Sequence, residues 1–194
     1  MRRAPVTSHR LFAMANHDSL KYTPRAIGLH WLIALFILCL MTVGFTMGDL
    51  PKGPDSPRGM VFNWHKTFGL ITGLLILYRY WWRSKNPPPI LPPEIPQWEV
   101  RLANVSHRLL YACMFLMPIS GYLGSNFHPK GYGVKLFNAI DLPAWGWPSQ
   151  ELYDIFNGTH KTVALVLATL IALHVVAAFK HLFSDSGVFR RMVP

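Results

Sequence analysis

Histidines are the residues of this 194-residue chain whose type and position most clearly suggest chemistry. The chain has nine histidines although only 14% of its residues are charged. Five of them lie in or beside long apolar segments: His30, His65, His107, His160 and His174. A polar imidazole is costly to place in hydrocarbon, so histidines in such segments usually have a function. Their number therefore indicates metal ligation or proton transfer.

The last apolar segment holds two of these histidines, His160 and His174, which are 14 residues apart. In an α-helix this spacing rotates the second side chain only about 40° from the first and separates the two by roughly 21 Å along the axis. Both imidazoles would face the same way, one near each surface of a membrane. This geometry suits two haems stacked inside a helix bundle, where facing helices supply the cofactor ligands.

Four apolar segments are long enough to position these side chains as membrane-spanning helices, which takes about 20 residues each. We expect the spans at about 26–48, 61–82, 102–124 and 159–183. The low charged fraction agrees, because soluble proteins carry about 25% charged residues. The sequence thus predicts one all-α domain over residues 1–194, an integral membrane four-helix bundle that encloses two haems.

Two connecting segments differ in character. Residues 86–96 contain six prolines and are expected to form a stiff, extended linker. Residues 125–158 form the longest connection, and a structureless loop of this length would be unusual. We therefore expect short interfacial helices over one mouth of the bundle.

The distribution of Lys and Arg predicts the orientation in the membrane. One side of the four spans carries six of the 19 basic residues: Lys52, Arg58, Lys66, Lys130, Lys135 and Lys161. The other 13 lie on the side of both termini. Cytoplasmic loops are enriched in Lys and Arg, so both termini are expected in the cytoplasm. Because the basic residues border the spans, the net charge of +10 does not indicate nucleic-acid binding.

This orientation pairs the histidines by depth. His30 and His174 should both lie near the inner surface, and His65 and His160 near the outer surface. Each pair could bind one haem iron from its two sides. His107 also lies near the inner surface, and its role stays open between a ligand that competes with His30, a quinone contact and a packing residue.

Other cofactor chemistries fit less well. The two cysteines, Cys39 and Cys113, are not part of a Cys-x-x-Cys-His motif, which excludes covalent c-type haem. Histidines near opposite membrane surfaces cannot share one zinc ion. A haem-free bundle, structural or transporting, in which the histidines bond to one another or carry protons, remains the alternative from another class.

Two local patterns accompany the predicted ligands. Gly69 and Gly73 follow His65 at four-residue steps and would leave a flat helix face for a porphyrin, or for another helix. The tripeptide His-Lys-Thr occurs at 65–67 and at 160–162. Lys66 and Lys161 would therefore lie beside the outer ligands, where they could neutralise haem propionates or simply extend to the membrane surface.

Several short motifs together resemble the bacterial di-haem cytochrome b561 family over nearly the whole chain. They are Leu29-His30-Trp31, Asn63-Trp64-His65-Lys66, Ser106-His107-Arg108, the pair His160 and His174, and the ending at 189–194. The resemblance implies two haems b, ligated by His30, His65, His160 and His174. It also implies a multi-pass protein of the bacterial inner membrane.

The resemblance implies electron transfer between a periplasmic donor and membrane quinone. Free-standing relatives include superoxide oxidases, so the expected activity is superoxide:ubiquinone oxidoreductase, with Lys66 and Lys161 at the outer mouth attracting the anion. The expected quinone contacts are Arg79, His107 and Arg108, unless these residues bind anionic lipid instead. The alternative function is that of a cytochrome b subunit, which would couple a dehydrogenase, a hydrogenase or a periplasmic cytochrome to the quinone pool.

Overall fold

The computed structural model describes residues 21–184 and 187–193. Its four long helices are α2 (Pro24–Thr46), α3 (Arg58–Lys85), α4 (Gln97–Asn126) and α5 (Gln150–Phe183). Each is long and apolar enough to cross a membrane. The predicted all-α membrane bundle is therefore confirmed, although every helix extends beyond its predicted span at one end or both. Arg2, Arg3 and Arg10, which contribute to the predicted orientation, lie outside the described residues.

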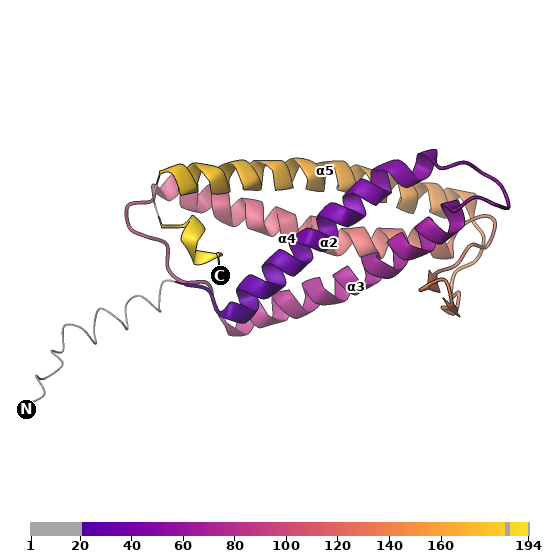
Figure 1. Ribbon diagram of the computed structural model, residues 1–194, viewed down its shortest axis with the longest axis horizontal. Helices are drawn as coiled ribbons and strands as arrows, with labels where there is room; N and C mark the ends of the chain where they lie inside the picture. Colours follow the sequence, from indigo (N-terminus) through magenta and orange to yellow (C-terminus); the bar gives the residue numbers. More distant parts are fainter. Residues whose placement is uncertain (1–20, 185–186, 194) are drawn as a thin grey trace, which may run out of the picture.

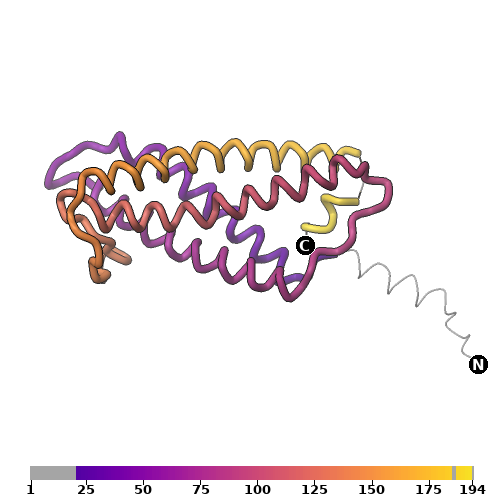
Figure 2. The backbone as a smooth tube through the Cα atoms, turned by 180° about the vertical axis from the view of Figure 1, so that it is seen from behind, coloured from indigo at the N-terminus to yellow at the C-terminus, as the bar shows by residue number. Residues whose placement is uncertain are grey.

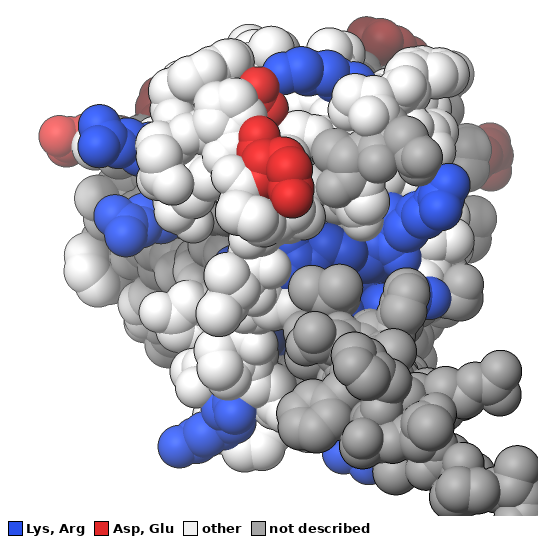
Figure 3. Space-filling model, turned by 90° about the vertical axis from the view of Figure 1, so that its left-hand side faces the viewer, with Lys and Arg blue, Asp and Glu red and all other residues white. Residues whose placement is uncertain are grey.

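The helices form one elongated bundle (Figures 1 and 2). Helix α4 packs on α5 and on α3, and α3 packs on α2, which crosses the bundle obliquely. We call the end with Pro24 and Phe183 the inner end, after the predicted orientation, and the opposite end the outer end. Figure 3 looks onto the inner end, where many Lys and Arg side chains are exposed.

Local sequence accounts for where two of the long helices start. Helix α2 begins at Pro24, after Thr23, whose hydroxyl oxygen accepts a hydrogen bond from the backbone N–H of Ala26 at 3.3 Å. Ser149 caps α5 in the same way, through the N–H of Leu152 at 3.3 Å. Such caps satisfy N–H groups that have no partner within the helix. The proline-rich linker between α3 and α4 is non-helical, as predicted.

The prediction of interfacial helices at the outer mouth is wrong. Helix α5 already starts at Gln150, because the Ser149 cap lets it extend beyond the apolar segment. The preceding residues form a small antiparallel hairpin of β1 (Lys135–Leu136) and β2 (Ile140–Asp141) instead. Phe137 and Asn138 adopt positive φ values of 53° and 57°, which turn the chain tightly between the strands.

The packed core lies in the middle of the bundle. Its buried residues are Ile33, Ile37, Ile76, Leu110, Cys113 and Leu167. On each helix these residues lie between the inner and outer histidine levels. Many large apolar side chains outside this core are exposed, such as Leu74 and Val176, as expected where lipid replaces water.

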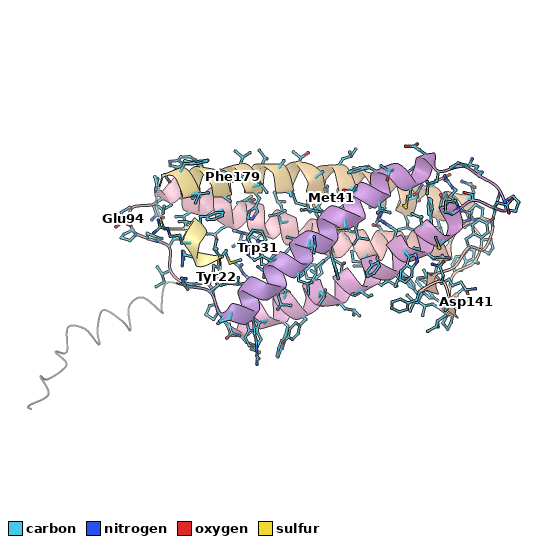
Figure 4. All side chains as sticks on the ribbon, in the orientation of Figure 1. Tyr22, Trp31, Met41, Glu94, Asp141 and Phe179 are labelled. Atoms are coloured by element: carbon cyan, nitrogen blue, oxygen red, sulfur yellow. The ribbon has the colours of Figure 1, made fainter. Side chains whose placement is uncertain are left out.

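The C-terminal segment closes the inner end of the bundle. After α5 it forms a short 3-10 helix, η2 (Phe189–Arg191), in which Arg191 is buried. A guanidinium N–H of Arg191 donates to the carbonyl of Ile90 in the linker at 3.0 Å. The indole N–H of Trp31 donates to the carbonyl of Met192 at 2.7 Å, and Figure 4 shows Trp31 beside this segment. The tail is thus attached to the first helix and to the linker.

Candidate functional site

His160 and His174 lie 14 residues apart on α5, one near each end of the bundle. Each of the other three long helices has a pair of residues at the same two levels and with the same spacing. We call the set near the inner end, His30, Arg79, His107 and His174, the inner quartet. We call the set near the outer end, Gly44, His65, Gly121 and His160, the outer quartet. Because this spacing corresponds to nearly four whole helical turns, the two residues on one helix face nearly the same way.

The outer quartet brings together the two predicted outer ligands, His65 and His160. Their ring centroids are 6.3 Å apart. Imidazole nitrogens bind metals at about 2.0 Å, so two imidazoles on opposite sides of one metal have centroids roughly 6 Å apart. The observed separation therefore fits one metal ion between the two rings.

A hydrogen bond orients the His160 ring. Its Nδ1 atom lies 3.0 Å from the carbonyl oxygen of Met117 and 3.2 Å from the hydroxyl of Ser120. Donation from Nδ1–H to the carbonyl leaves Nε2 as the nitrogen with a free lone pair, which a metal requires. The Nδ1 atom of His65 is buried and has no hydrogen-bond partner in the described part of the chain.

The inner quartet contains three histidines. The ring centroids of His30 and His174 are 6.3 Å apart, the same separation as in the outer pair. The ring of His107 is even closer to His174, at 5.5 Å. The structure thus brings together the inner pair that depth predicted, and it adds His107 as a neighbour of His174.

The two helices that carry each histidine pair do not pack closely on each other. His30 and His174 belong to α2 and α5, and His65 and His160 belong to α3 and α5. Neither of these helix pairs is among those that pack closely in the described structure. Each imidazole pair thus joins two helices that the bundle holds apart, so the residues fit two haems.

The sequence did not single out Gly44 and Gly121 as part of the site. A Cβ on Gly44 would lie 3.1 Å from Cε1 of His65, and one on Gly121 would lie 3.0 Å from Cε1 of His160. These two glycines therefore make room for the outer imidazoles. The spacing between His160 and His174, applied from His30 and His107, could have found them.

The glycines that the sequence did single out behave differently. A Cβ on Gly73 would lie 3.1 Å from Pro118, so Gly73 serves the packing of α3 on α4 and not a porphyrin face. Gly69 has open space around it and stays compatible with either role.

The two outer lysines are placed differently. The ammonium of Lys66 donates to the carbonyl of Gly133 at 2.9 Å, which binds α3 to the outer loop. Lys161, by contrast, is exposed. His128 lies close by, and its burial, with the charges of Lys66 and Lys130, lowers the pKa of its imidazole below the ordinary value. The lowered pKa favours the neutral form of the His128 imidazole, which carries no positive charge.

A cavity of about 400 Å³ lies between α3 and α4 near the inner end. It is lined by Tyr80, Arg83, Asn104, His107, Arg108, Tyr111, Ala112 and Phe115. The structure thus brings His107 and Arg108 into one cavity, but Arg79 does not line it. The hydroxyl of Tyr111 is buried and has no hydrogen-bond partner among the described residues.

Two half-buried imidazole pairs inside four helices long enough to span a membrane are typical of a multi-pass haem-binding membrane protein. The sequence pattern of the family described as prokaryotic cytochrome b561 matches residues 21–194, and the chain belongs to this family. Members of the family carry haem b and transport electrons, so this chain is a membrane electron-transfer protein.

Three relatives are similar to this chain at low sequence identity over most of its length. Cytochrome b561 homolog 1 of Escherichia coli is 25% identical over 90% of this chain and 97% of its own length. Cytochrome b561 homolog 2 of the same organism is 27% identical, over 89% and 91%. A protein of Yersinia pestis named probable superoxide oxidase CybB is 27% identical, over 89% and 96%.

Proposed function

We propose that the protein oxidises superoxide at the outer end of the bundle and reduces ubiquinone near the inner end. His65 and His160 would hold one haem b, and His30 and His174 a second. The observation that carries the proposal is the equal separation of 6.3 Å in both imidazole pairs. Haem iron held in this way supplies one-electron chemistry. Two superoxide anions give two electrons and two molecules of O₂, and ubiquinone takes these electrons with two protons to form ubiquinol.

The cavity between α3 and α4 is our candidate for the quinone site. Quinone sites need an apolar or aromatic slot with a few polar groups, and cavities for such ligands begin at about 300 Å³. Tyr80, Tyr111 and Phe115 provide the aromatic walls, and their rings contact one another at centroid distances of 5.6 to 6.2 Å. The Tyr111 hydroxyl, which has no hydrogen-bond partner among the residues that the structure describes, is suited to donate to a quinone carbonyl oxygen.

His107 supports this placement, because it belongs to two sites at once. It lines the cavity between α3 and α4, and its ring is 5.5 Å from that of His174. A quinone in the cavity would therefore lie one side chain away from the inner haem ligand. Arg108, on the same wall, would offer a positive charge to the reduced quinone.

Superoxide as the donor is supported by the name of the Yersinia pestis relative and by the cations of the outer end. Lys161 is exposed and directly follows the outer ligand His160. Positive charge around a site raises the encounter rate with a small anion. We expect Lys66 to contribute less than Lys161 to this encounter rate, because the Lys66 ammonium is held by the Gly133 carbonyl.

The test uses the purified full-length protein in detergent. Pyridine haemochrome analysis should give two haems b per chain, and superoxide should reduce a soluble ubiquinone analogue only when the protein is present. One haem or none would contradict the two-site proposal. Two haems without superoxide-dependent reduction would instead favour a subunit that couples a dehydrogenase or a periplasmic cytochrome to the quinone pool.

A further inference from the structure

Arg79 occupies the place in α3 that a histidine ligand occupies in α5. It follows His65 at the same spacing at which His174 follows His160. Both helices run from the outer to the inner end, so Arg79 and His174 reach the same depth. Because the spacing is nearly four whole helical turns, Arg79 also faces nearly the same way as His65, toward the inside of the bundle.

The Arg79 side chain is held in place by the neighbouring helix. One guanidinium N–H donates to the carbonyl of Ala26 in α2 at 2.7 Å. Ala26 lies one turn before His30 on the same helix. The charge of Arg79 acts on His30, His107 and His174, which together are the other three members of the inner quartet.

Most of the hydrogen-bonding capacity of Arg79 is not used by the described residues. A guanidinium has five N–H donors, and a single hydrogen bond, to Ala26, involves Arg79 within the described part of the chain. None of the ion pairs formed there includes Arg79. A charge inside a membrane bundle is costly unless an opposite charge or hydrogen bonds compensate it. A haem beside His30 and His174 would bring two propionate carboxylates, which a guanidinium binds well.

The outer quartet lacks such a cation. Gly44 and Gly121 take the two positions that are not histidine, and both lie against imidazole rings. The neighbouring Lys66 lies outside the quartet; its ammonium donates to the Gly133 carbonyl, and its positive charge interacts with His65 alone of the two outer imidazoles. The two sites therefore have similar histidine pairs but differ in the position of the positive charge: Arg79 is a member of the inner quartet and interacts with all three of its histidines, whereas Lys66 lies beside the outer quartet.

We propose that Arg79 is a positioning residue of the inner haem site, whose fixed positive charge raises the reduction potential of the inner haem. Reduction adds an electron, and a nearby positive charge favours the reduced form. The inner haem thereby becomes the better electron acceptor, which directs electrons from the outer end toward the cavity between α3 and α4. The inference rests on the two-haem site proposed above, and it assigns Arg79 to haem and not to quinone.

Potentiometric titration of the purified protein, followed by haem absorbance, tests the proposal. The variant Arg79→Gln removes the charge and keeps hydrogen-bonding groups, whereas Arg79→Lys keeps the charge. Arg25→Gln is the matched control, since it removes an exposed positive charge at the same end of the bundle. The two midpoints are assigned with His65→Met, because replacing one histidine ligand by methionine raises the potential of that haem alone.

We expect Arg79→Gln to lower the midpoint of the inner haem, while the outer midpoint stays unchanged. In Arg79→Lys the midpoint of the inner haem should stay close to that of the unaltered protein. Arg25→Gln should have little effect on either midpoint. Selective loss of the inner haem in Arg79→Gln, with retention in Arg79→Lys, would support the same charge role. An unchanged midpoint in Arg79→Gln, or an equal shift in Arg25→Gln, would overturn the proposal.

Loss of the inner haem in both Arg79→Gln and Arg79→Lys would also overturn the proposal. The hydrogen bond to Ala26, and not the positive charge, would then account for the role of Arg79. The haem count of the unaltered protein separates this inference from the proposed function. One haem per chain refutes the two-haem site itself, whereas two haems with no effect of Arg79 refute only the charge role.

Discussion

Gly121 lies directly against the imidazole of His160: a Cβ at position 121 would come within 3.0 Å of the Cε1 atom of that ring. Gly44 stands in the same relation to His65, at 3.1 Å. Two helices that supply no ligand to the outer site therefore shape it by the absence of a side chain. Since a metal-bound imidazole cannot turn away freely, a methyl group at either position must displace the ring or the helix.

We therefore expect Gly121→Ala and Gly44→Ala to affect the outer haem selectively. Overpacking costs about 1–3 kcal/mol, which exceeds the gain of roughly 0.5–1 kcal/mol from replacing glycine by alanine in a helix. Each variant should lower the outer haem occupancy or change the spectrum of that haem. Gly158→Ala is the matched control, because Gly158 is an exposed glycine of α5 at the outer end and its Cβ would meet open space. Equal spectra for all three variants would show that the close contacts do not constrain the ligands.

Loss of a histidine ligand should remove one haem and leave the other. Changing His65 or His160 to Ala should abolish the outer haem, and changing His30 or His174 to Ala should abolish the inner one. The remaining partner becomes a half-buried imidazole without its metal, so some loss of thermal stability should follow. Haem content per chain, with the difference spectrum of each variant, gives the result.

His107→Ala is the control for these ligand variants. It removes an imidazole of the inner quartet that our pairing does not use, so both haems should remain. If His107→Ala lost a haem while His30→Ala kept two, the inner ligand pair would be His107 with His174.

The Tyr111 hydroxyl should contribute to quinone binding and not to stability. It has no hydrogen-bond partner among the described residues, so Tyr111→Phe should leave the melting temperature nearly unchanged. Losing one hydrogen bond to the quinone costs about 1 kcal/mol, which corresponds to roughly a fivefold rise in the KM for quinone. Tyr78→Phe changes an exposed tyrosine outside the cavity and should not alter KM. A KM that does not change in Tyr111→Phe would place the quinone elsewhere.

Superoxide oxidation should depend on salt through the outer lysines. Salt screens exposed charges over about 8 Å at physiological ionic strength, so the rate should fall as salt rises. Lys161→Gln should slow the reaction at low salt and flatten the salt dependence, with both haems retained. Lys52→Gln removes an exposed charge from the loop between α2 and α3 and should matter less.

The Lys66 variant separates steering from structure. Lys66→Gln also removes the bond to the Gly133 carbonyl, so it should loosen the outer loop in addition to any effect on rate. A salt-independent rate in the unaltered protein, or identical rates for Lys161→Gln and the unaltered protein, would contradict electrostatic steering.

Patterns within single chain segments were enough to predict the spans and the depth of each histidine. A helix must be apolar to cross hydrocarbon, and a spacing of nearly four whole turns returns a side chain to the same face. This reasoning paired His30 with His174 and His65 with His160, which the structure brings to equal separations.

The rotation of the helices toward one another could not be predicted in this way. A single helix does not reveal that Gly121 lies against His160. It also does not reveal that Arg79 donates to Ala26 and does not line the cavity beside His107. Nor does it show that the Lys66 ammonium donates to a loop carbonyl. These contacts depend on packing angles and on residues distant in the sequence. Periodicity fixes which face of a helix a side chain occupies, but only the packing of all four helices fixes what that face meets.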